Sequence, residues 1–282
     1  MGANGAGKST LVKILCGVHQ AESGSIELFE QPFRPQRPVD AFKAGVVTVH
    51  QSINDGVVPD LDVASNLMLD RLTEKKSGFF ISQKVLKTNA TAIAQTMGIS
   101  IKVETPVSEL GVADRQLIAI ARAMARNPKV LILDEPTAGV DIELRRSLWD
   151  FLTEINNNGT TIILTTHYLE EAERLCRNIA IIDSGEIVEN TSMQELLTRL
   201  EVETFVFDLS QPLVNLPEST EFEMSLENPM KLKVTVGKGQ GLNSVFKILS
   251  DLGIEISSMR NDTGRLEELF MGLVESNLEE RK

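Results

Sequence analysis

The chain has 282 residues, of which 42% are apolar and 24% charged, and its formal net charge is −12. The apolar content excludes a mainly disordered chain, and the length predicts about two domains. Nucleic-acid partners favour clustered basic surfaces, so 40 acidic against 28 basic residues argue against nucleic-acid binding as the main role. The longest apolar runs, such as 130–133, are far short of the ~18 residues that cross a bilayer.

The hydrophobic pattern of the first two hundred residues predicts alternating helices and strands. A helix is expected over 10–18, and residues 60–126 are mainly helical in pattern, apart from a charged break around 74–78. The expected strands are 25–29, 45–50, 129–133, 160–165 and 178–183. Continuous apolar strands that alternate with amphipathic helices predict a parallel sheet covered on both faces.

A change of composition after Thr198 predicts a second, smaller α+β domain at 203–282, following a first domain at 1–202. Its expected elements are strands at 203–208, 231–236 and 254–258, a linker at 215–218, and helices at 242–252 and 265–276. The last helix carries an apolar stripe of Leu266, Leu269, Phe270 and Leu273. This domain contains no cluster of catalytic type, so a dimerising or regulatory module and a core-completing appendage both remain open.

A phosphate-binding loop is predicted at the start of the chain. Gly2-Ala-Asn-Gly-Ala-Gly-Lys-Ser matches G-x-x-x-x-G-K-[ST] at every position. Glycines let successive backbone N–H groups converge on phosphate oxygens, and the following helix presents its positive N-terminus. Lys8 is then expected to reach the β- and γ-phosphates of a nucleotide, and Ser9 to offer its hydroxyl to Mg²⁺.

The strand at 130–133 runs into two adjacent carboxylates, Asp134 and Glu135. Beside a phosphate loop, this pattern predicts that Asp134 holds Mg²⁺ and that Glu135 polarises the attacking water. Adjacent strand residues point to opposite sides of a sheet, which suits two different tasks. Gln51 and His167 follow two other predicted strands, and His167 taken alone is more simply interpreted as a structural histidine.

The order of these motifs resembles the ATP-binding subunit of ABC transporters over about residues 1–200. The phosphate loop is followed by Val49-His50-Gln51, a helical insert, Leu-Asp-Glu-Pro-Thr-Ala-Gly-Val-Asp at 133–141, and Thr166-His167. The resemblance implies an α/β P-loop NTPase fold, that of an ABC ATPase, with a parallel-sheet core and a helical subdomain at about 55–126. It also implies that the protein is an ATPase that powers transport.

The resemblance assigns roles to individual residues of this chain. It implies that Gln51 touches Mg²⁺ and senses the membrane subunit, that Asp141 lies at a dimer interface, and that His167 lies near the γ-phosphate. Catalysis is implied for Glu135, His167 and Lys8, and Mg²⁺ binding for Ser9, Gln51 and Asp134. ATP binding is implied for Gly2, Ala3, Asn4, Gly5, Ala6, Gly7, Lys8, Ser9, Thr10, Gln51, Leu110, Gly111 and Asp141.

The implied partners follow from the same family. The subunit is expected as a homodimer or with a paired ABC ATPase, head to tail with two ATP molecules between the subunits. It is expected to bind an integral membrane permease and to lie peripherally on the cytoplasmic face of the cell membrane, without a nucleic-acid partner. The transported substrate is chosen by other subunits.

The family's Leu-Ser-Gly-Gly-Gln signature is degenerate in this chain, where it falls on Leu110-Gly-Val-Ala-Asp. Gly111 replaces a serine whose hydroxyl, in the family, bonds the partner's γ-phosphate. Ala113 replaces the second glycine, and Asp114 replaces glutamine with a charge of the same sign as phosphate. This loop is expected to slow hydrolysis, and a binding-only pseudo-ATPase is one alternative. A soluble ABC-type ATPase acting on nucleic acid or ribosomes is the other.

The two parts of the chain resemble different branches of the family. Residues 1–128 are similar to sugar-importer ATPases, whereas residues 129–282 are similar to the ATPases of second-type ABC exporters, including a final Leu-Glu-Glu-Leu-Phe at 266–270. A mosaic chain is therefore expected. Only Met1 precedes the phosphate loop, where a strand is expected, so the chain is also expected to be an N-terminal truncation with an uncovered sheet edge.

Overall fold

The computed structural model describes residues 1–3, 5–51, 56–73, 82–198, 202–216, 221–237 and 239–262. Asn4, the charged break around 74–78 and the expected helix at 265–276 lie outside these ranges. The chain divides into two compact units, one formed by 1–167 with 182–186 and the other by 168–181 with 187–282. This division differs from a boundary at 202/203, which stays a prediction.

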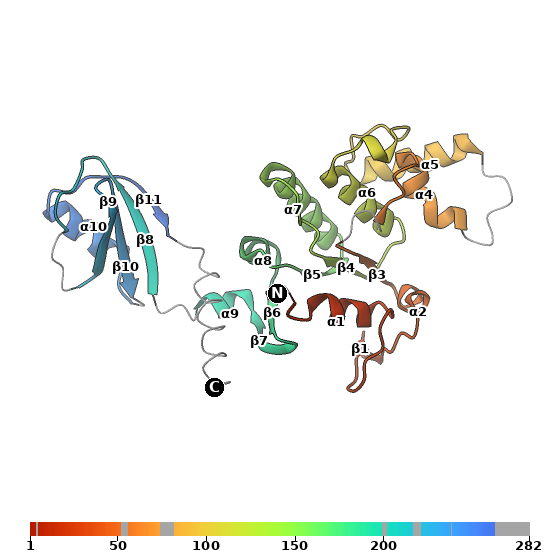
Figure 1. Cartoon of the computed structure of the whole chain (residues 1–282), viewed down its shortest axis with the longest axis horizontal. Coiled ribbons are helices and arrows are strands. Elements are labelled where there is room, and N and C mark those ends of the chain that lie inside the picture. Colours follow the sequence, from red (N-terminus) through yellow and green to blue (C-terminus); the bar gives the residue numbers. More distant parts are fainter. Residues whose placement is uncertain are drawn as a thin grey trace. The chain divides into compact units, whose positions relative to one another are not determined.

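A three-stranded parallel sheet forms the centre of the first unit (Figure 1). Strand β4 (Val130–Asp134) lies between β3 (Val46–Val49) and β5 (Thr161–Thr165), and both pairs are parallel. All five residues of β4 are buried. The predicted parallel sheet is thus confirmed for these three strands. The physical reason is that a continuous apolar run such as β4 is stable when it is buried inside a sheet.

Helices cover both faces of this sheet. Val12 of α1 (Lys8–Leu15) belongs to one apolar cluster with Val46, Val130 and Ile132. On the neighbouring strand position, Val47 faces α6 (Val112–Met124) across a cavity. Since successive strand residues point to opposite faces, α1 and α6 lie on opposite sides of the sheet.

The remaining elements of the first unit are helical, apart from one short hairpin. The hairpin consists of β1 (Glu27–Leu28) and β2 (Gln31–Pro32). The helices are α2 (Pro38–Lys43), α4 (Val63–Thr73), α5 (Gln83–Thr96), the 3-10 turn η1 (Val107–Glu109) and α7 (Ile142–Asn157). Helix α4 contacts both α5 and α6. Helices α4, α5 and α6 and the turn η1 match the helical pattern expected over 60–126.

Strand β6 (Asn178–Asp183) departs from the sequence-based expectation. In the described part of the chain it pairs with β7 (Glu186–Ser192), a strand that the sequence pattern did not reveal, and not with the parallel sheet. Next to the hairpin turn, the Ile182 amide donates to the carbonyl of Met1 at 2.7 Å, and the Gly185 amide donates to the carbonyl of Ala6 at 2.9 Å. These bonds anchor the first residues of the chain.

The second unit contains an antiparallel sheet in the order β11-β8-β10-β9, packed against α10 (Leu242–Asp251) (Figure 1). Its strands are β8 (Val202–Leu209), β9 (Glu223–Asn228), β10 (Lys231–Gly237) and β11 (Ile256–Asn261). Two short helices, α8 (Leu169–Leu175) and α9 (Met193–Thr198), also belong to this unit. Strand β9 was not expected, and β11 ends three residues later than predicted.

Phe207, Leu232, Val234, Val245 and Leu249 are fully buried between this sheet and α10. The sheet therefore has its own core. Among the described residues of the whole chain, no helix is long and apolar enough to cross a membrane.

Candidate active site

The loop that precedes α1 has the geometry of an anion-binding turn. Gly5 and Gly7 adopt φ angles of 82° and 106°, which residues with a Cβ rarely tolerate. Gly7 is the N-cap of α1, and its carbonyl accepts the amide of Leu11. The amides of the first helical turn have no partner within the helix, so this end of α1 is positive and open to an anion.

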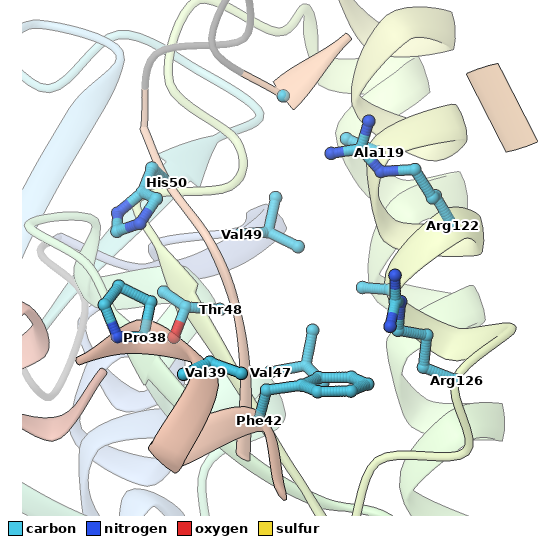
Figure 2. Close-up of a pocket in the computed structure, with 12 residues that line it drawn as sticks. Pro38, Val39, Phe42, Val47, Thr48, Val49, His50, Ala119, Arg122 and Arg126 are labelled. Carbon is cyan, nitrogen blue, oxygen red and sulfur yellow. The ribbon is translucent and has the colours of Figure 1, made fainter. Parts of the chain in front are cut away.

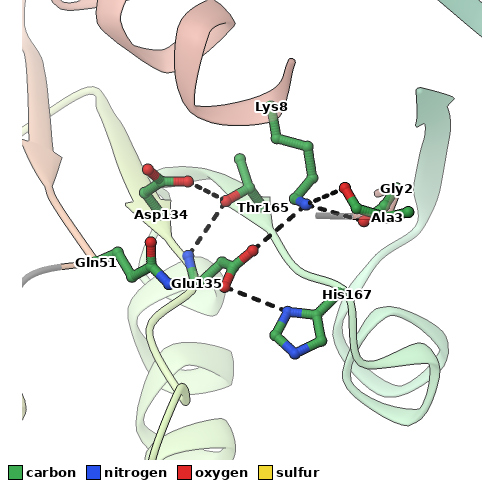
Figure 3. A network of polar contacts seen from close by, with 8 residues as sticks. All are labelled: Gly2, Ala3, Lys8, Gln51, Asp134, Glu135, Thr165 and His167. Atoms are coloured by element: carbon green, nitrogen blue, oxygen red, sulfur yellow. Dashed lines mark hydrogen bonds and ion pairs between the residues drawn. The ribbon is translucent and has the colours of Figure 1, made fainter. Parts of the chain in front are cut away.

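Lys8 is the first residue of α1, and its side chain is only 5% exposed. Its ammonium donates to the carbonyls of Gly2 at 2.9 Å and Ala3 at 3.0 Å. The same nitrogen lies 3.4 Å from Oε1 of Glu135 (Figure 3). The charge of Lys8 is thus aimed into the loop and toward the residue that follows β4.

Glu135 contacts side chains from three parts of the chain. Besides the ion pair with Lys8, its Oε2 accepts the amide of Gln51 at 3.0 Å and lies 3.2 Å from Nδ1 of His167. Gln51 is the second residue after β3, and His167 is the second residue after β5. The carboxyl ends of parallel strands meet at one edge of a sheet, which explains why these side chains converge.

Strand alternation does not decide where Glu135 points. Strand β4 ends at Asp134, and Glu135 has a φ of 49°, in the left-handed region. Asp134 accepts a short hydrogen bond from the hydroxyl of Thr165. The two carboxylates therefore occupy different surroundings, as expected, but a backbone turn and not the pleat separates them.

A cavity of about 420 Å³ opens over this cluster. It is lined by Gly5, Gly7, Lys8, Ser9, Thr10, Gln51, Glu135, Ala138 and His167. All but Ala138 are residues to which the sequence assigned a role. Gly2 and Ala3 do not line the cavity themselves, but their carbonyls accept hydrogen bonds from Lys8, which does. Asn4 lies outside the described residues.

Three predicted ATP-binding residues lie elsewhere in the fold. Leu110 and Gly111 precede α6, where Gly111 is the N-cap. Asp141 is the N-cap of α7, and its carboxylate accepts the amide of Leu144 at 3.0 Å. Gly111 and Asp141 are exposed, and none of the three belongs to the lining of the cavity.

Sequence reasoning missed two residues of this site. Ala138 lines the cavity as part of the turn after Glu135, and an alanine offers no chemical signal by which to find it. Thr165 contacts Asp134 and Glu135, although it was only expected to belong to a strand. A hydroxyl at the last position of the strand, opposite the first of the two carboxylates, was the available signal.

The donor groups near the cavity suit a magnesium ion. Ser9 and Gln51 line the cavity and offer a hydroxyl and an amide oxygen. Asp134 is not in the lining, but it directly precedes Glu135, which is, and it offers a carboxylate. Mg²⁺ prefers such oxygen ligands together with phosphate oxygens. Cysteine and histidine clusters of the kind that select zinc do not occur among the described residues.

Comparison with known proteins agrees with this geometry. Residues 1–138 match the family model of the ABC transporter. The chain is 36% identical over 188 residues to the galactofuranose transporter ATP-binding protein YtfR of Escherichia coli K12. This alignment covers 67% of this chain and 37% of YtfR. The chain is also 36% identical over 196 residues to the fructose import ATP-binding protein FruK of Bifidobacterium longum, over 69% of this chain and 37% of FruK.

Solved structures of the same kind share the fold. An ATP-binding cassette in its ADP conformation, MJ1267, superposes with a TM-score of 0.60 at 23% identity, over 71% of this chain and 82% of that one. CbiO1 of Clostridium perfringens gives the same TM-score at 24% identity, over 71% and 78% of the two chains.

The chain spans little more than a third of the length of the curated relatives it matches. Within that span, the phosphate loop, the carboxylate pair after β4 and the residues after β3 and β5 occupy one site. The chain therefore carries an ABC transporter ATP-binding domain.

Proposed function

We propose that the chain binds ATP with Mg²⁺ in the cavity at Lys8 and hydrolyses it to power transport through a separate membrane permease. The observation that carries this proposal is the position of the Glu135 carboxylate. It lies in a cavity whose floor is a phosphate loop, within 3.4 Å of Lys8 and 3.2 Å of His167. A base and a phosphate-binding lysine at this separation suit the attack of water on a terminal phosphate.

Each side chain has a distinct task in this mechanism. The loop amides and the N-terminus of α1 bind the phosphates, and Lys8 neutralises charge on the β- and γ-phosphates. Glu135 accepts the proton of the attacking water at a carboxylate oxygen, and His167 orients that carboxylate. Ser9, Gln51 and Asp134 hold the magnesium ion, which when bound neutralises developing phosphate charge.

A second cassette completes the site in this proposal. Gly111 and Asp141 are exposed at the N-termini of α6 and α7 and lie outside the lining of the cavity. In a head-to-tail dimer, or a pair with another ABC ATPase, Leu110, Gly111 and Asp141 of one subunit face the ATP of the other. The ATP-binding cassette MJ0796, a similar structure, is dimeric in a post-hydrolysis state bound to ADP and Pi.

A second cavity of about 380 Å³ suits the permease (Figure 2). It lies between α2, β3 and α6, with Val39 and Phe42 on one side and Arg122 and Arg126 on the other. The guanidinium of Arg126 stacks 4.4 Å from the centre of the Phe42 ring. An amphipathic cytoplasmic helix of the permease fits this cavity, because its apolar side chains suit Val39 and Phe42 and its acidic side chains suit the two arginines.

Two consecutive residues after β3 line different cavities. His50 lines the proposed permease cavity, and the next residue, Gln51, lines the cavity at Lys8. Movement of this short segment on permease docking changes the position of Gln51, which contacts Glu135. This adjacency supports the proposed role of Gln51 as a sensor of the membrane subunit. The proposal also includes a peripheral position on the cytoplasmic face of the cell membrane and no nucleic-acid partner.

The proposed direction of transport is import of a sugar. The alignment with YtfR covers 188 residues, so the importer likeness is not confined to residues 1–128. The exporter resemblance of residues 129–282 remains a prediction, and so does a mosaic origin.

Titration calorimetry of the full chain with ATP, with and without Mg²⁺, tests the binding proposal, and steady-state phosphate release tests hydrolysis. We expect Mg²⁺-dependent binding and slow turnover. Absence of ATP binding under both conditions overturns the proposed function.

A further inference from the structure

We infer that Thr165 is a positioning residue that holds the metal-binding carboxylate of Asp134 and the backbone turn of Glu135 in their working geometry. This inference rests on the proposed Mg²⁺ site. It concerns a side chain that is not among the residues lining the cavity and that contacts Asp134 and Glu135 (Figure 3).

The sheet register brings Thr165 to Asp134. Strands β4 and β5 are parallel, and Asp134 pairs with Thr165 as the last pair of the ladder. The hydroxyl of Thr165 donates to Oδ1 of Asp134 in a short hydrogen bond. A bond at Oδ1 restricts rotation of the carboxylate and leaves Oδ2 for a cation, which is how outer partners orient metal ligands.

The same residue supports the turn at Glu135. The backbone amide of Glu135 donates to the carbonyl of Thr165 at 3.0 Å and to its hydroxyl oxygen at 3.2 Å. Glu135 needs this support because its φ of 49° is unfavourable for a residue with a Cβ. This turn directs the Glu135 side chain to Lys8, Gln51 and His167.

A purely structural strand residue does not need the hydroxyl. Thr165 is 8% exposed, and Asp134 and Glu135 are 5% and 8% exposed, so all three are screened from water. Leu133 and Leu164, the pair before them in the ladder, are apolar. Valine has nearly the shape of threonine and suits a buried strand, so the chemical content of this position lies in one donor and one acceptor.

Four variants of the full chain test the inference. Thr165→Val removes the hydroxyl at almost constant shape, Thr165→Ser keeps it, and Thr161→Val removes a hydroxyl at the exposed start of the same strand. The fourth, Asp134→Asn, weakens the metal ligand itself. The measurement is the dissociation constant of ATP in EDTA and at increasing Mg²⁺, together with the Mg²⁺ concentration that gives half of the maximal effect.

We expect Thr165→Val to raise the half-maximal Mg²⁺ concentration by about 10-fold, since loss of an outer partner typically weakens metal affinity 10- to 100-fold. The dissociation constant in EDTA should change less than 2-fold. Thr165→Ser should restore the Mg²⁺ dependence to within about 3-fold of the parent, and Thr161→Val should leave it unchanged.

Three results overturn the inference: an unchanged Mg²⁺ midpoint in Thr165→Val, an equal loss of binding in EDTA and in Mg²⁺, or a serine variant as impaired as the valine variant. Failure of the underlying Mg²⁺ site gives a different pattern. In that case the parent chain itself shows no Mg²⁺ dependence, and Asp134→Asn changes nothing.

Discussion

The ammonium of Lys8 lies 3.4 Å from the carboxylate of Glu135, and both side chains are less than a tenth exposed. Lys8 belongs to the phosphate loop at the start of α1, and Glu135 directly follows β4. The two residues are therefore far apart in the sequence. Removal of either partner leaves the other as a buried charge without this ion pair, which is destabilising. A phosphate bound to Lys8 competes directly with Glu135 for the ammonium.

Lys8→Ala should weaken ATP binding at least ~10²-fold, since each lost hydrogen bond to a charged group costs about 1.5–3 kcal/mol and Lys8 serves two phosphates. Titration calorimetry measures the effect. Lys13→Ala, at an exposed position in the last turn of the same helix, is the matched control. Equal affinities of the parent and Lys8→Ala would show that the loop does not bind phosphate.

Glu135→Gln should lower phosphate release at least ~10²-fold while ATP binding persists, because the amide keeps the shape and cannot accept the proton. Trapped ATP should also favour the dimer, as a higher mass in light scattering. Glu143→Gln, in the exposed first turn of α7, controls for loss of charge. Parental turnover in Glu135→Gln would show that Glu135 has only a structural role in the turn after β4.

Gly111→Ser combined with Asp114→Gln should accelerate hydrolysis at saturating ATP at least ~5-fold. Gly111 has a φ of −67°, and a Cβ placed there meets no atom within 4 Å, so serine fits without strain. The new hydroxyl supplies a hydrogen bond worth about 1.5–3 kcal/mol to phosphate, and the second change removes a repelling charge. Equal rates would indicate that this loop does not face nucleotide or that another step limits turnover.

The same substitutions have opposite effects on helix stability, which provides a check on folding. Serine is a good N-cap residue, whereas Asp114 lies in the first turn of α6 and benefits from the helix dipole. The net change should stay within about 1 kcal/mol. Melting curves of the parent and the double variant should therefore nearly coincide.

Phe207→Ala should destabilise the second unit by about 3–5 kcal/mol, because the ring is fully buried in the core of its sheet. Phe246 packs edge-to-face on Phe207, with ring centres 5.8 Å apart, but it is 40% exposed. Phe246→Ala therefore removes an equal ring at a less buried position. Its cost should be about half or less. Hydrogen exchange of the amides in α10 and β8 at increasing denaturant measures the free energy of unfolding of each variant. Equal losses of stability in the two variants would contradict the assigned core.

Ile163→Lys should reduce self-association of the chain. In the described residues β5 is an outer strand of the parallel sheet, and Ile163 is 40% exposed. An open edge with apolar side chains templates strand pairing between molecules, and a lysine interrupts it. Light scattering against protein concentration measures the change, with Thr161→Lys as a control on the same strand. Unchanged scattering would show that this edge is not the contact.

The sequence alone was sufficient where the information is local. The glycines at positions 2, 5 and 7 before Lys8 specify a turn, a continuous apolar run specifies the buried strand β4, and helical periodicity specifies α10. These patterns report backbone preference and burial within a few residues, which one segment expresses by itself. The order of motifs then identified an ATP-binding domain.

Tertiary structure decided what depends on distant partners. The pairing of β6 with β7, the edge strand β9 with its polar residues, and the turn at Glu135 leave no clear local pattern. Thr165 meets Asp134 because the register of two parallel strands joins residues 31 positions apart. Strand propensity permits many registers, and only the packing of helices and strands into one core selects the register that gathers Lys8, Gln51, Glu135 and His167 at a single sheet edge.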